Sequence, residues 1–535
     1  MVTEDWRRSE ATGQLDNTNF VERRTLLKAL GATSVASGLS TPAIAAADDH
    51  DGSFDVVEAT ATDIRTALEN GCTTVRKVVD QYLERIDAYD DELNAILTVN
   101  PNARNRADEL DTKLDKGEII GPLHGIPTIL KDNQDTKDMP TTGAAVTLED
   151  SMAPADAFVV KRMREAGAII LAKANLHEIA GGGTTVSSLG GQTRNPYALD
   201  RTPGGSSGGT SAALAVSMAP IGFGTDTVNS IRSPASACNM VGLRPSTGLV
   251  SRVGTIPVAL THDMVGPITL SVADAAIMLD VIAGYDPADP STARGVGDIP
   301  DSYTDHLDPN GLQNARIGLL RSVFSSGPES EPVLDVTEQA ITDLEALGAK
   351  TIEIDADIDV DELIDSFYVA DFERQEQFND YLDSLESGAP IDTFAEFVEA
   401  GEYHPTLEEG LMAALGIESP TDDPEYFERL YRRDQFIERL YDLMAANELD
   451  AFFFPHQKQL VAEIGDDQLG RNGFLSSGTG FSSITVPGGF SEGGVPVGIE
   501  FLCRPFDEST LFELAYAYEQ ATQHRQPSDR YGSLN

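Results

Sequence analysis

The sequence predicts an α/β protein in which helices flank a central mixed, mostly parallel β-sheet, built as a single large domain. Short apolar runs typical of buried strands alternate along the chain with longer segments of helical periodicity. This alternation is the pattern of a sheet covered by helices. Apolar runs return near the C-terminus, at 449–455, 481–488 and 495–501. The 535 residues are interpreted as one domain.

Helices come first along the chain. Two are expected over 56–98, where Val75, Val78, Tyr82 and Ile86 recur at spacings of three and four residues and form one apolar face. The later helices and strands follow from the same periodicities. Helices are expected at 103–116, 158–166, 271–283 and 511–520, and strands within 121–132, at 168–172 and at 220–224.

Residues from about 286 to 450 differ from the rest of the chain in composition, with an acidic run followed by helices that carry aromatic residues. The run at 353–365 interleaves acidic with apolar residues. We interpret it as a solvated edge of the fold, since the glycine and the regularly spaced oxygen ligands of a calcium loop are missing. The helices that follow carry Phe, Tyr and Leu, and we expect them to cover one side of the functional cleft and to set substrate choice.

Charge and cysteine content exclude several classes of protein. The chain has 87 Asp+Glu against 38 Lys+Arg, a formal net charge of −49, which disfavours nucleic acid and anionic membranes as partners. At about 1 M salt the Debye length falls to ~3 Å, so such a surface is tolerated in concentrated salt; we interpret the protein as halophilic. Three cysteines make no disulfide framework or metal site, and no apolar run is long enough to span a membrane.

Residues 1–45 have the features of an export signal. A twin-arginine segment at 22–28 precedes a mildly apolar stretch at 29–39 and a small-residue cleavage site at 43–45. A disordered arm with an incidental arginine pair is the alternative. The order of the three features favours export by the twin-arginine route to an extracellular or cell-surface location, with the main domain at 46–535.

The most distinctive stretch is glycine- and serine-rich. Residues 204–211 hold four glycines and three serines and lead into helix formers at 212–216, as in a loop whose free backbone N–H groups feed a helix N-terminus. A flexible linker is the alternative, which the apolar, periodic flanks disfavour. A second glycine-punctuated turn at 222–232 carries Ser230, 24 residues after Ser206, and Lys131 lies 75 residues before Ser206.

Three segments in this order resemble the amidase signature family: Gly121-Pro-Leu-His-Gly-Ile-Pro127 with Lys131-Asp132, the Gly-Gly-Ser-Ser-Gly-Gly loop, and a Gly-Thr-Asp turn ending in Ser-Ile-Arg. The resemblance covers about three-quarters of the chain after the export segment. It implies hydrolysis of a linear carboxamide by a Ser-cisSer-Lys triad, without cofactor or metal. By resemblance Ser230 is the nucleophile, Ser206 the bridging serine and Lys131 the base. The residues implied in oxyanion or substrate binding are Thr227, Val228, Asn229, Gly205 and Ser207.

Lys131 has to be neutral to accept a proton. Lowering an ammonium pKa from about 10.4 to about 7.5 costs roughly 4 kcal/mol. Burial beside Ile126, Ile129 and Leu130 would supply part of this shift, whereas the adjacent Asp132 would oppose it if it were close and charged. His124 and His177, the histidines nearest these motifs, are interpreted as structural.

The sequence departs from the family at Val228-Asn229, where the family usually has two glycines. Valine does not take positive φ comfortably, whereas asparagine does so at modest cost. We therefore expect negative φ at Val228, any left-handed conformation at Asn229, and backbone N–H groups of 227–230 that still serve an oxyanion hole.

Three functional hypotheses follow. The first is an exported, salt-adapted amidohydrolase whose partner is a small-molecule amide, with a homodimer left open. The second is the A subunit of a glutamyl-tRNA amidotransferase, which the export signal and the acidic surface disfavour. The third is a non-catalytic binding protein that retains the fold, which the presence of Lys131, Ser206 and Ser230 disfavours.

Overall fold

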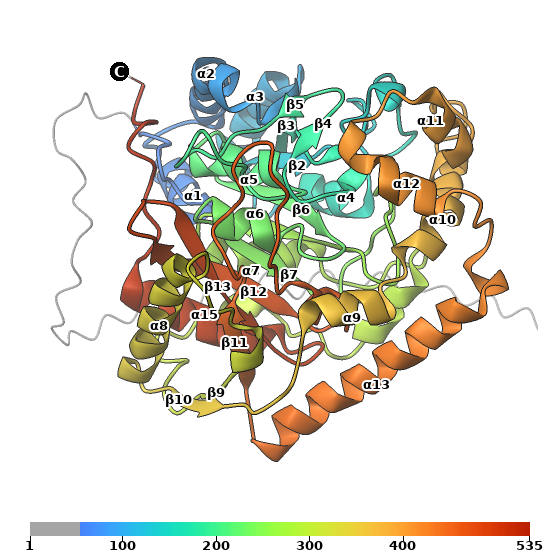
Figure 1. Ribbon diagram of the computed structural model, residues 1–535. Helices are drawn as coiled ribbons and strands as arrows, with labels where there is room; N and C mark the ends of the chain where they lie inside the picture. The colour runs from blue at the N-terminus through green and yellow to red at the C-terminus, as the bar shows by residue number, and fades with distance from the viewer. Residues whose placement is uncertain (1–53, 535) are drawn as a thin grey trace, which may run out of the picture. The chain divides into compact units, whose positions relative to one another are not determined.

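The computed structural model describes residues 54–534, which form one compact unit (Figure 1). The predicted export segment at 1–45 lies outside the described residues. The main sheet has eleven strands in the order β1-β3-β2-β6-β8-β7-β12-β13-β11-β9-β10, and β4 and β5 form a separate hairpin. The strands are β1 (Ile96–Val99), β2 (Pro127–Lys131), β3 (Ile169–Ala174), β4 (Val186–Ser187), β5 (Gly191–Gln192), β6 (Ile221–Asp226), β7 (Val241–Arg244), β8 (Met264–Thr269), β9 (Arg316–Leu319), β10 (Lys350–Glu353), β11 (Ala451–Pro455), β12 (Ser483–Phe490) and β13 (Pro496–Leu502).

The predicted mixed sheet in one large domain is confirmed. Its parallel pairs lie in two groups, β3-β2-β6 toward one edge and β11-β9-β10 at the other. The other six pairs, including all those between β6 and β11, are antiparallel. Antiparallel pairs therefore outnumber parallel ones, whereas the alternation of strands and helices predicted a mostly parallel sheet. One reason is that a tight turn, and not a helix, joins β12 to β13, and strands joined in this way pair antiparallel.

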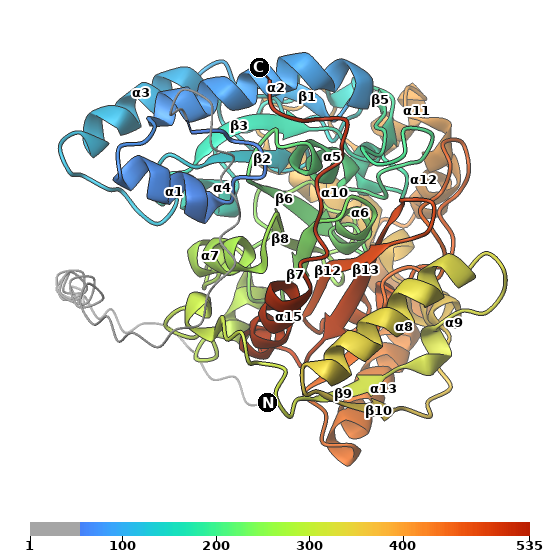
Figure 2. The same ribbon diagram turned by 90° about the vertical axis from the view of Figure 1, so that its left-hand side faces the viewer.

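Helices cover the sheet. They are α1 (Ala61–Glu69), α2 (Val75–Leu93), α3 (Ala103–Leu114), α4 (Phe158–Glu165), α5 (Gly208–Ala215), α6 (Arg232–Ala237), α7 (Val272–Ile282), α8 (Glu331–Ala346), α9 (Val360–Phe367), α10 (Ala370–Ser384), α11 (Phe394–Ala400), α12 (Glu408–Ala414), α13 (Pro424–Ala446), α14 (Phe474–Ser477) and α15 (Glu508–Thr522). In Figure 2, α8 and α15 lie in front of the strands β12 and β13. None of the helices in residues 54–534 is long and apolar enough to cross a bilayer.

The helices and strands predicted in the N-terminal half occur within a few residues of their expected positions. Thr60 and Thr74 cap α1 and α2 by accepting hydrogen bonds from backbone N–H groups of the first turn. The apolar face predicted for the second helix is buried: Val75, Val78 and Tyr82 are fully inaccessible. This burial packs α2 against the core. It also explains why the spacing of the apolar residues was sufficient to predict the helix.

The acidic run at 353–365 lies at the edge of the sheet, as predicted. It begins at the end of β10, the last strand in the sheet order, and continues into α9. Ile354, Ile358 and Val360 are buried, whereas the aspartates between them are exposed. The alternation lets the run cover apolar residues while its charges stay in water.

Candidate active site

Lys131 is the last residue of the buried strand β2 and is fully inaccessible. Its Nζ donates to the Ser206 hydroxyl at 2.7 Å and to the Thr225 hydroxyl at 2.6 Å. The Asn133 side-chain amide donates to the same Thr225 oxygen at 3.0 Å. The parallel strands β2 and β6 thus bring a lysine and a threonine together beside the glycine-serine loop.

Burial lowers the pKa of Lys131 to about 7, against the opposing influence of the carboxylates of Asp226 and Asp263. The adjacent Asp132, expected to oppose this shift if close, is instead paired with Lys173 of β3 at 2.8 Å. Its other oxygen accepts from the Thr142 backbone N–H at 3.2 Å. A second lysine therefore compensates Asp132, and Lys131 is left without a carboxylate partner among residues 54–534.

The glycine-serine loop carries Ser206 against this lysine. The Gly205–Ser206 peptide bond is cis, and Ser206 is fully buried. A side chain at Gly205 would collide with the backbone of Gly183, which lies 2.7 Å from the position of a Cβ atom. The Ser207 N–H donates to the Ser230 carbonyl at 3.2 Å, and this bond joins the two serine loops.

Ser230 follows β6 in a loop whose backbone donors are free. Within residues 54–534, the N–H groups of 227–230 donate to no protein acceptor, and the Ser230 hydroxyl is likewise without a hydrogen bond. Ser230 is 7% exposed. These unused backbone donors, in a site largely closed to water, are available to hydrogen-bond a bound oxygen atom.

The loop conformation differs in part from the expectation. Val228 has negative φ as predicted, but so does Asn229, since neither is among the residues with positive φ. Side chains fix this loop: the Val228 carbonyl accepts from Ser477 Oγ at 2.9 Å, and the Asn229 Oδ1 accepts from Arg471 at 3.1 Å. A left-handed turn is unnecessary where distant side chains hold both residues.

A buried charge network lies beside this loop. Arg232 binds Asp226 at 3.0 Å and Glu500 at 2.6 Å, and all three side chains are fully inaccessible. Arg244 also contacts Asp226 at 3.2 Å, and His456 contacts Glu500 at 2.6 Å. Although burial by itself raises the pKa of Asp226, the two arginines lower it to about 2. Arg232 also donates to the Val228 carbonyl at 3.0 Å, so the network fixes the loop before Ser230.

The two histidines have the structural contacts expected of them. His124 accepts from the Ile120 N–H and contacts the Leu110 carbonyl, and His177 contacts Thr184 and Thr406. Sequence reasoning missed Thr225 and Asn133. Thr225 lies in the Gly-Thr-Asp motif itself, and Asn133 is two residues after Lys131, so their position in the motifs was the available signal.

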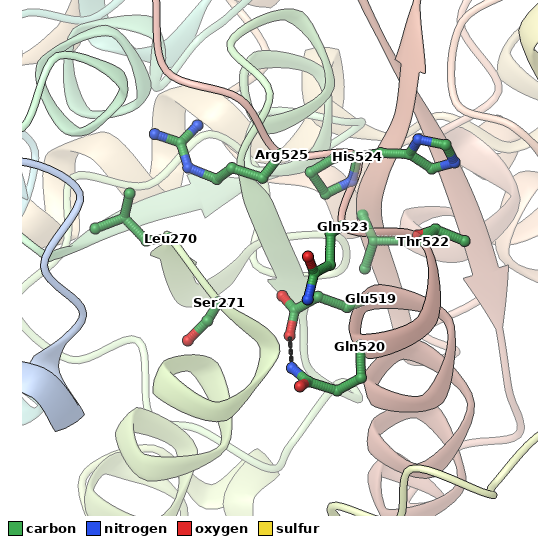
Figure 3. A pocket seen from close by; sticks show the side chains of 10 residues that line it. Leu270, Ser271, Glu519, Gln520, Thr522, Gln523, His524 and Arg525 are labelled. Carbon is green, nitrogen blue, oxygen red and sulfur yellow. Dashed lines mark hydrogen bonds between the residues drawn. The ribbon is translucent and has the colours of Figure 1, made fainter. Parts of the chain in front are cut away.

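A cavity of about 170 Å³ lies elsewhere, between the β8–α7 junction, β12 and the end of α15 (Figure 3). Its lining includes none of the predicted site residues. Glu519 accepts from the Val272 N–H at 2.8 Å and from Gln520 at 3.3 Å, and Arg525 binds Glu58 at 2.8 Å. The protein itself supplies partners for Glu519 and Arg525, although the Arg525 Nε is buried without one.

The fold defines an α/β protein in which a mixed central sheet brings a buried lysine into contact with a serine hydroxyl. The family model described as Amidase matches residues 77–512, so the chain belongs to the amidase family.

Its relatives include a peptide amidase and the A subunits of glutamyl-tRNA(Gln) amidotransferases. The chain is 34% identical over 491 residues to the A subunit of the Thermoanaerobacter pseudethanolicus amidotransferase, covering 88% of this chain and 98% of that protein. The native peptide amidase of Stenotrophomonas maltophilia superposes with a TM-score of 0.81 at 34% identity, covering 88% and 98% of the two chains. The A subunit of the Thermotoga maritima amidotransferase superposes with a TM-score of 0.67 at 29% identity, covering 87% and 95%.

Proposed function

We propose that the protein hydrolyses a linear carboxamide through an acyl-enzyme on Ser230, with Ser206 as the bridging serine and Lys131 as the base. One observation carries the proposal: the Lys131 Nζ lies 2.7 Å from the Ser206 hydroxyl. Burial also lowers the pKa of this lysine to about 7. An amine of that pKa is half neutral near pH 7 and therefore available as a general base.

In the first half of the reaction, the Ser230 Oγ attacks the amide carbonyl carbon while its proton passes to Ser206, whose own proton passes to neutral Lys131. The carbonyl oxygen becomes an oxyanion, which the N–H groups of 227–230 would receive. The proton then returns through Ser206 to the leaving nitrogen, the C–N bond breaks, and an amine or ammonia departs. Water repeats the same proton transfers to release the acid.

Gly205 and Ser207 support this chemistry by position. Gly205 allows the loop to approach Gly183, and Ser207 ties the loop to Ser230 through the hydrogen bond to its carbonyl. The Ser207 hydroxyl is also bonded to the backbone of Thr225 at 3.3 Å. Ser207 thereby links the loop that carries Ser206 to the strand that carries Thr225.

The A subunit of an amidotransferase is the second candidate, because a relative of that name is 34% identical over nearly its whole length. Two features favour the stand-alone amidase. The twin-arginine segment within residues 1–45 would direct the protein away from cytoplasmic tRNA, and a net charge of −49 repels tRNA phosphates.

The test uses the full-length protein at about 2 M salt, where exposed charges are well screened. We expect ammonia release from simple amides without added subunits, and stoichiometric labelling of Ser230 by a fluorophosphonate probe, located by peptide mass spectrometry. Labelling and ammonia release should both be lost in Ser230→Ala. Hydrolysis that requires added subunits would favour the amidotransferase, and neither labelling nor turnover would favour the non-catalytic protein.

Export by the twin-arginine route and adaptation to high salt are parts of this proposal, and a homodimer is the alternative to a monomer. Replacing Arg23 and Arg24 by lysine should leave uncleaved precursor in the cytoplasm, and cytoplasmic, uncleaved wild-type protein would contradict export. The mass in solution, measured by light scattering at high salt, decides between one copy and two.

A further inference from the structure

Two guanidinium groups close to the site have no carboxylate partner among residues 54–534. Arg374 of α10 is 7% exposed and donates one hydrogen bond, to the Ile179 carbonyl at 3.1 Å, while its Nε is buried without a partner. Arg471, in the segment between β11 and α14, is half-buried and donates one side-chain bond, to Asn229 at 3.1 Å. A buried cation without a partner is costly, so both groups call for an explanation.

Three fully buried arginines among residues 54–534, Arg85, Arg232 and Arg244, have partners, although the Arg244 Nε has none. Arg232 and Arg244 are paired with Asp226, and Arg85 donates to four backbone carbonyls. The chain has 87 acidic residues from which partners could have been drawn. Asp361 lies near Arg471 but is not within ion-pair distance of it; its nearest cation is Lys458, at 4.0 Å.

Both guanidinium groups contact the same three-glycine loop, 181–183. A Cβ atom at Gly183 would collide with the guanidinium of Arg471, and one at Gly181 would lie 3.2 Å from Nη2 of Arg374. Gly183 in turn packs on Gly205, at the cis peptide bond of Ser206. The two cations therefore flank a loop that touches the catalytic loop, and Arg471 additionally touches Asn229, next to Ser230.

We propose that Arg374 and Arg471 form a carboxylate-binding subsite, so that the substrate is an amide that also carries a carboxylate. This inference rests on the proposed amidase activity. A guanidinium group binds a carboxylate through paired, charge-assisted hydrogen bonds, and a bound carboxylate would supply the partner that both arginines lack. The net charge of −49 repels an anionic substrate from the molecule as a whole; local cations at the site are what would retain it.

The subsite also accounts for Asn229. Glycine at this position would leave Arg471 without its hydrogen bond, since the Asn229 side-chain oxygen is the acceptor that holds the guanidinium. Asn229, which stands where the family usually has a glycine, then contributes to substrate recognition by positioning Arg471, in addition to its part in the loop conformation. Because Arg374 belongs to the region 286–450, that region contributes to substrate choice through this residue.

The test compares two amides that differ in one group, glutaramate with its free carboxylate and pentanamide without one, at fixed pH and salt. Charge-assisted hydrogen bonds predict a kcat/KM about 10- to 100-fold higher for glutaramate. Arg374→Gln and Arg471→Gln should each lower this value about 10-fold or more, mainly through KM. The value for pentanamide should change by less than about twofold in Arg374→Gln. Arg471→Gln also removes the hydrogen bond that holds Asn229 and should lower the value for both amides, so the ratio of the two values is the readout for this variant. Arg439→Gln is the matched control, since Arg439 is exposed on α13 and donates only to the Asp357 carbonyl.

Binding gives a readout that does not depend on turnover. In the Ser230→Ala background, calorimetry should show tighter binding of glutaramate than of pentanamide, and added Arg374→Gln or Arg471→Gln should abolish the difference. Equal binding of the two amides, or a preference that survives both substitutions, would overturn the subsite. A glutaramate preference in binding without hydrolysis of either amide would instead support the subsite and count against the proposed activity.

Discussion

The region around the proposed catalytic residues and the acidic region at 286–450 place their charges in opposite ways. In the first, Lys131, Asp226 and Arg232 are fully buried, and each ion is held by defined partners or has a shifted pKa. In the second, helix α13 carries ion pairs such as Arg432–Glu425, with side chains 36% and 39% exposed. Buried charges determine chemistry because their desolvation is costly, whereas exposed charges are screened and individually weak.

The two regions meet at a few residues. Tyr368 and Arg374 come from the acidic region, yet Tyr368 stacks on His262 at a ring-centroid distance of 5.8 Å, and Arg374 donates to the Ile179 carbonyl. The acidic region therefore has a solvated outer face and an inner face against the site. Five experiments test this division, in order of decreasing expected effect.

The largest effect is expected at the catalytic residues. Ser230→Ala should abolish acyl-enzyme formation and reduce kcat by about 10⁴-fold or more, and Lys131→Ala and Ser206→Ala should each cost about 10³-fold or more. Because the three residues act as one relay, combining any two of these substitutions should lower kcat hardly further than the more damaging of the two does alone. Full turnover in Ser230→Ala, measured by ammonia release, would refute the mechanism.

The second effect concerns stability. Arg232→Met leaves the carboxylates of Asp226 and Glu500 buried with fewer partners, which should lower the free energy of unfolding by about 3–5 kcal/mol. Urea titration at fixed high salt measures it. A loss below about 1 kcal/mol lies in the range of exposed ion pairs. It would show that the buried pairs stabilise the protein no more than the exposed pairs of the acidic region do.

The third effect is a pH dependence. Lys131 acts as a base only when neutral, and burial lowers its pKa to about 7. Below that pH its neutral fraction falls about tenfold per pH unit, so kcat/KM should fall with the same slope as the pH decreases from 7 to 5 and level off above about 8. A profile that stays flat down to pH 5 would show that Lys131 is not the base.

The fourth effect is a loss of structure at low salt, which we expect first in the acidic region. On dilution from about 2 M to about 0.1 M salt, unscreened repulsion between carboxylates grows. Hydrogen exchange should accelerate first in residues 286–450 and only later in β2 and β6. Exchange that is unchanged over this range, or that accelerates first in the core strands, would contradict the halophilic interpretation.

The smallest effect is expected for a single exposed ion pair. Arg432→Gln removes contacts with Glu425 and Glu428 and should cost about 0.5 kcal/mol or less at ~0.1 M salt and nothing measurable at ~2 M. The same urea titration that is used for Arg232→Met provides the comparison. A loss as large as that of the buried pair would mean that α13 is not solvated as the structure indicates.

Much of the fold could be predicted from local patterns. The apolar face of α2, the caps at Thr60 and Thr74, and the apolar runs of β2 and β3 are properties of short segments, which periodicity and capping residues report directly. The strand pairing could not be predicted in the same way. Whether β12 lies antiparallel to β7, about 240 residues earlier in the chain, depends on loop closure and packing across the whole sheet.

By itself the sequence determined which residues are candidates for the chemistry, because the glycine-serine loop, the Gly-Thr-Asp turn and the lysine segment are local motifs that each contain their functional side chain. The tertiary structure alone decided what those side chains touch. It pairs Asp132 with Lys173, places the hydroxyls of Ser206 and Thr225 on Lys131, and holds Asn229 by Arg471 with negative φ. Each of these contacts joins residues tens to hundreds of positions apart, and burial, which lowers the pKa of Lys131, is likewise a property of the assembled sheet rather than of any segment.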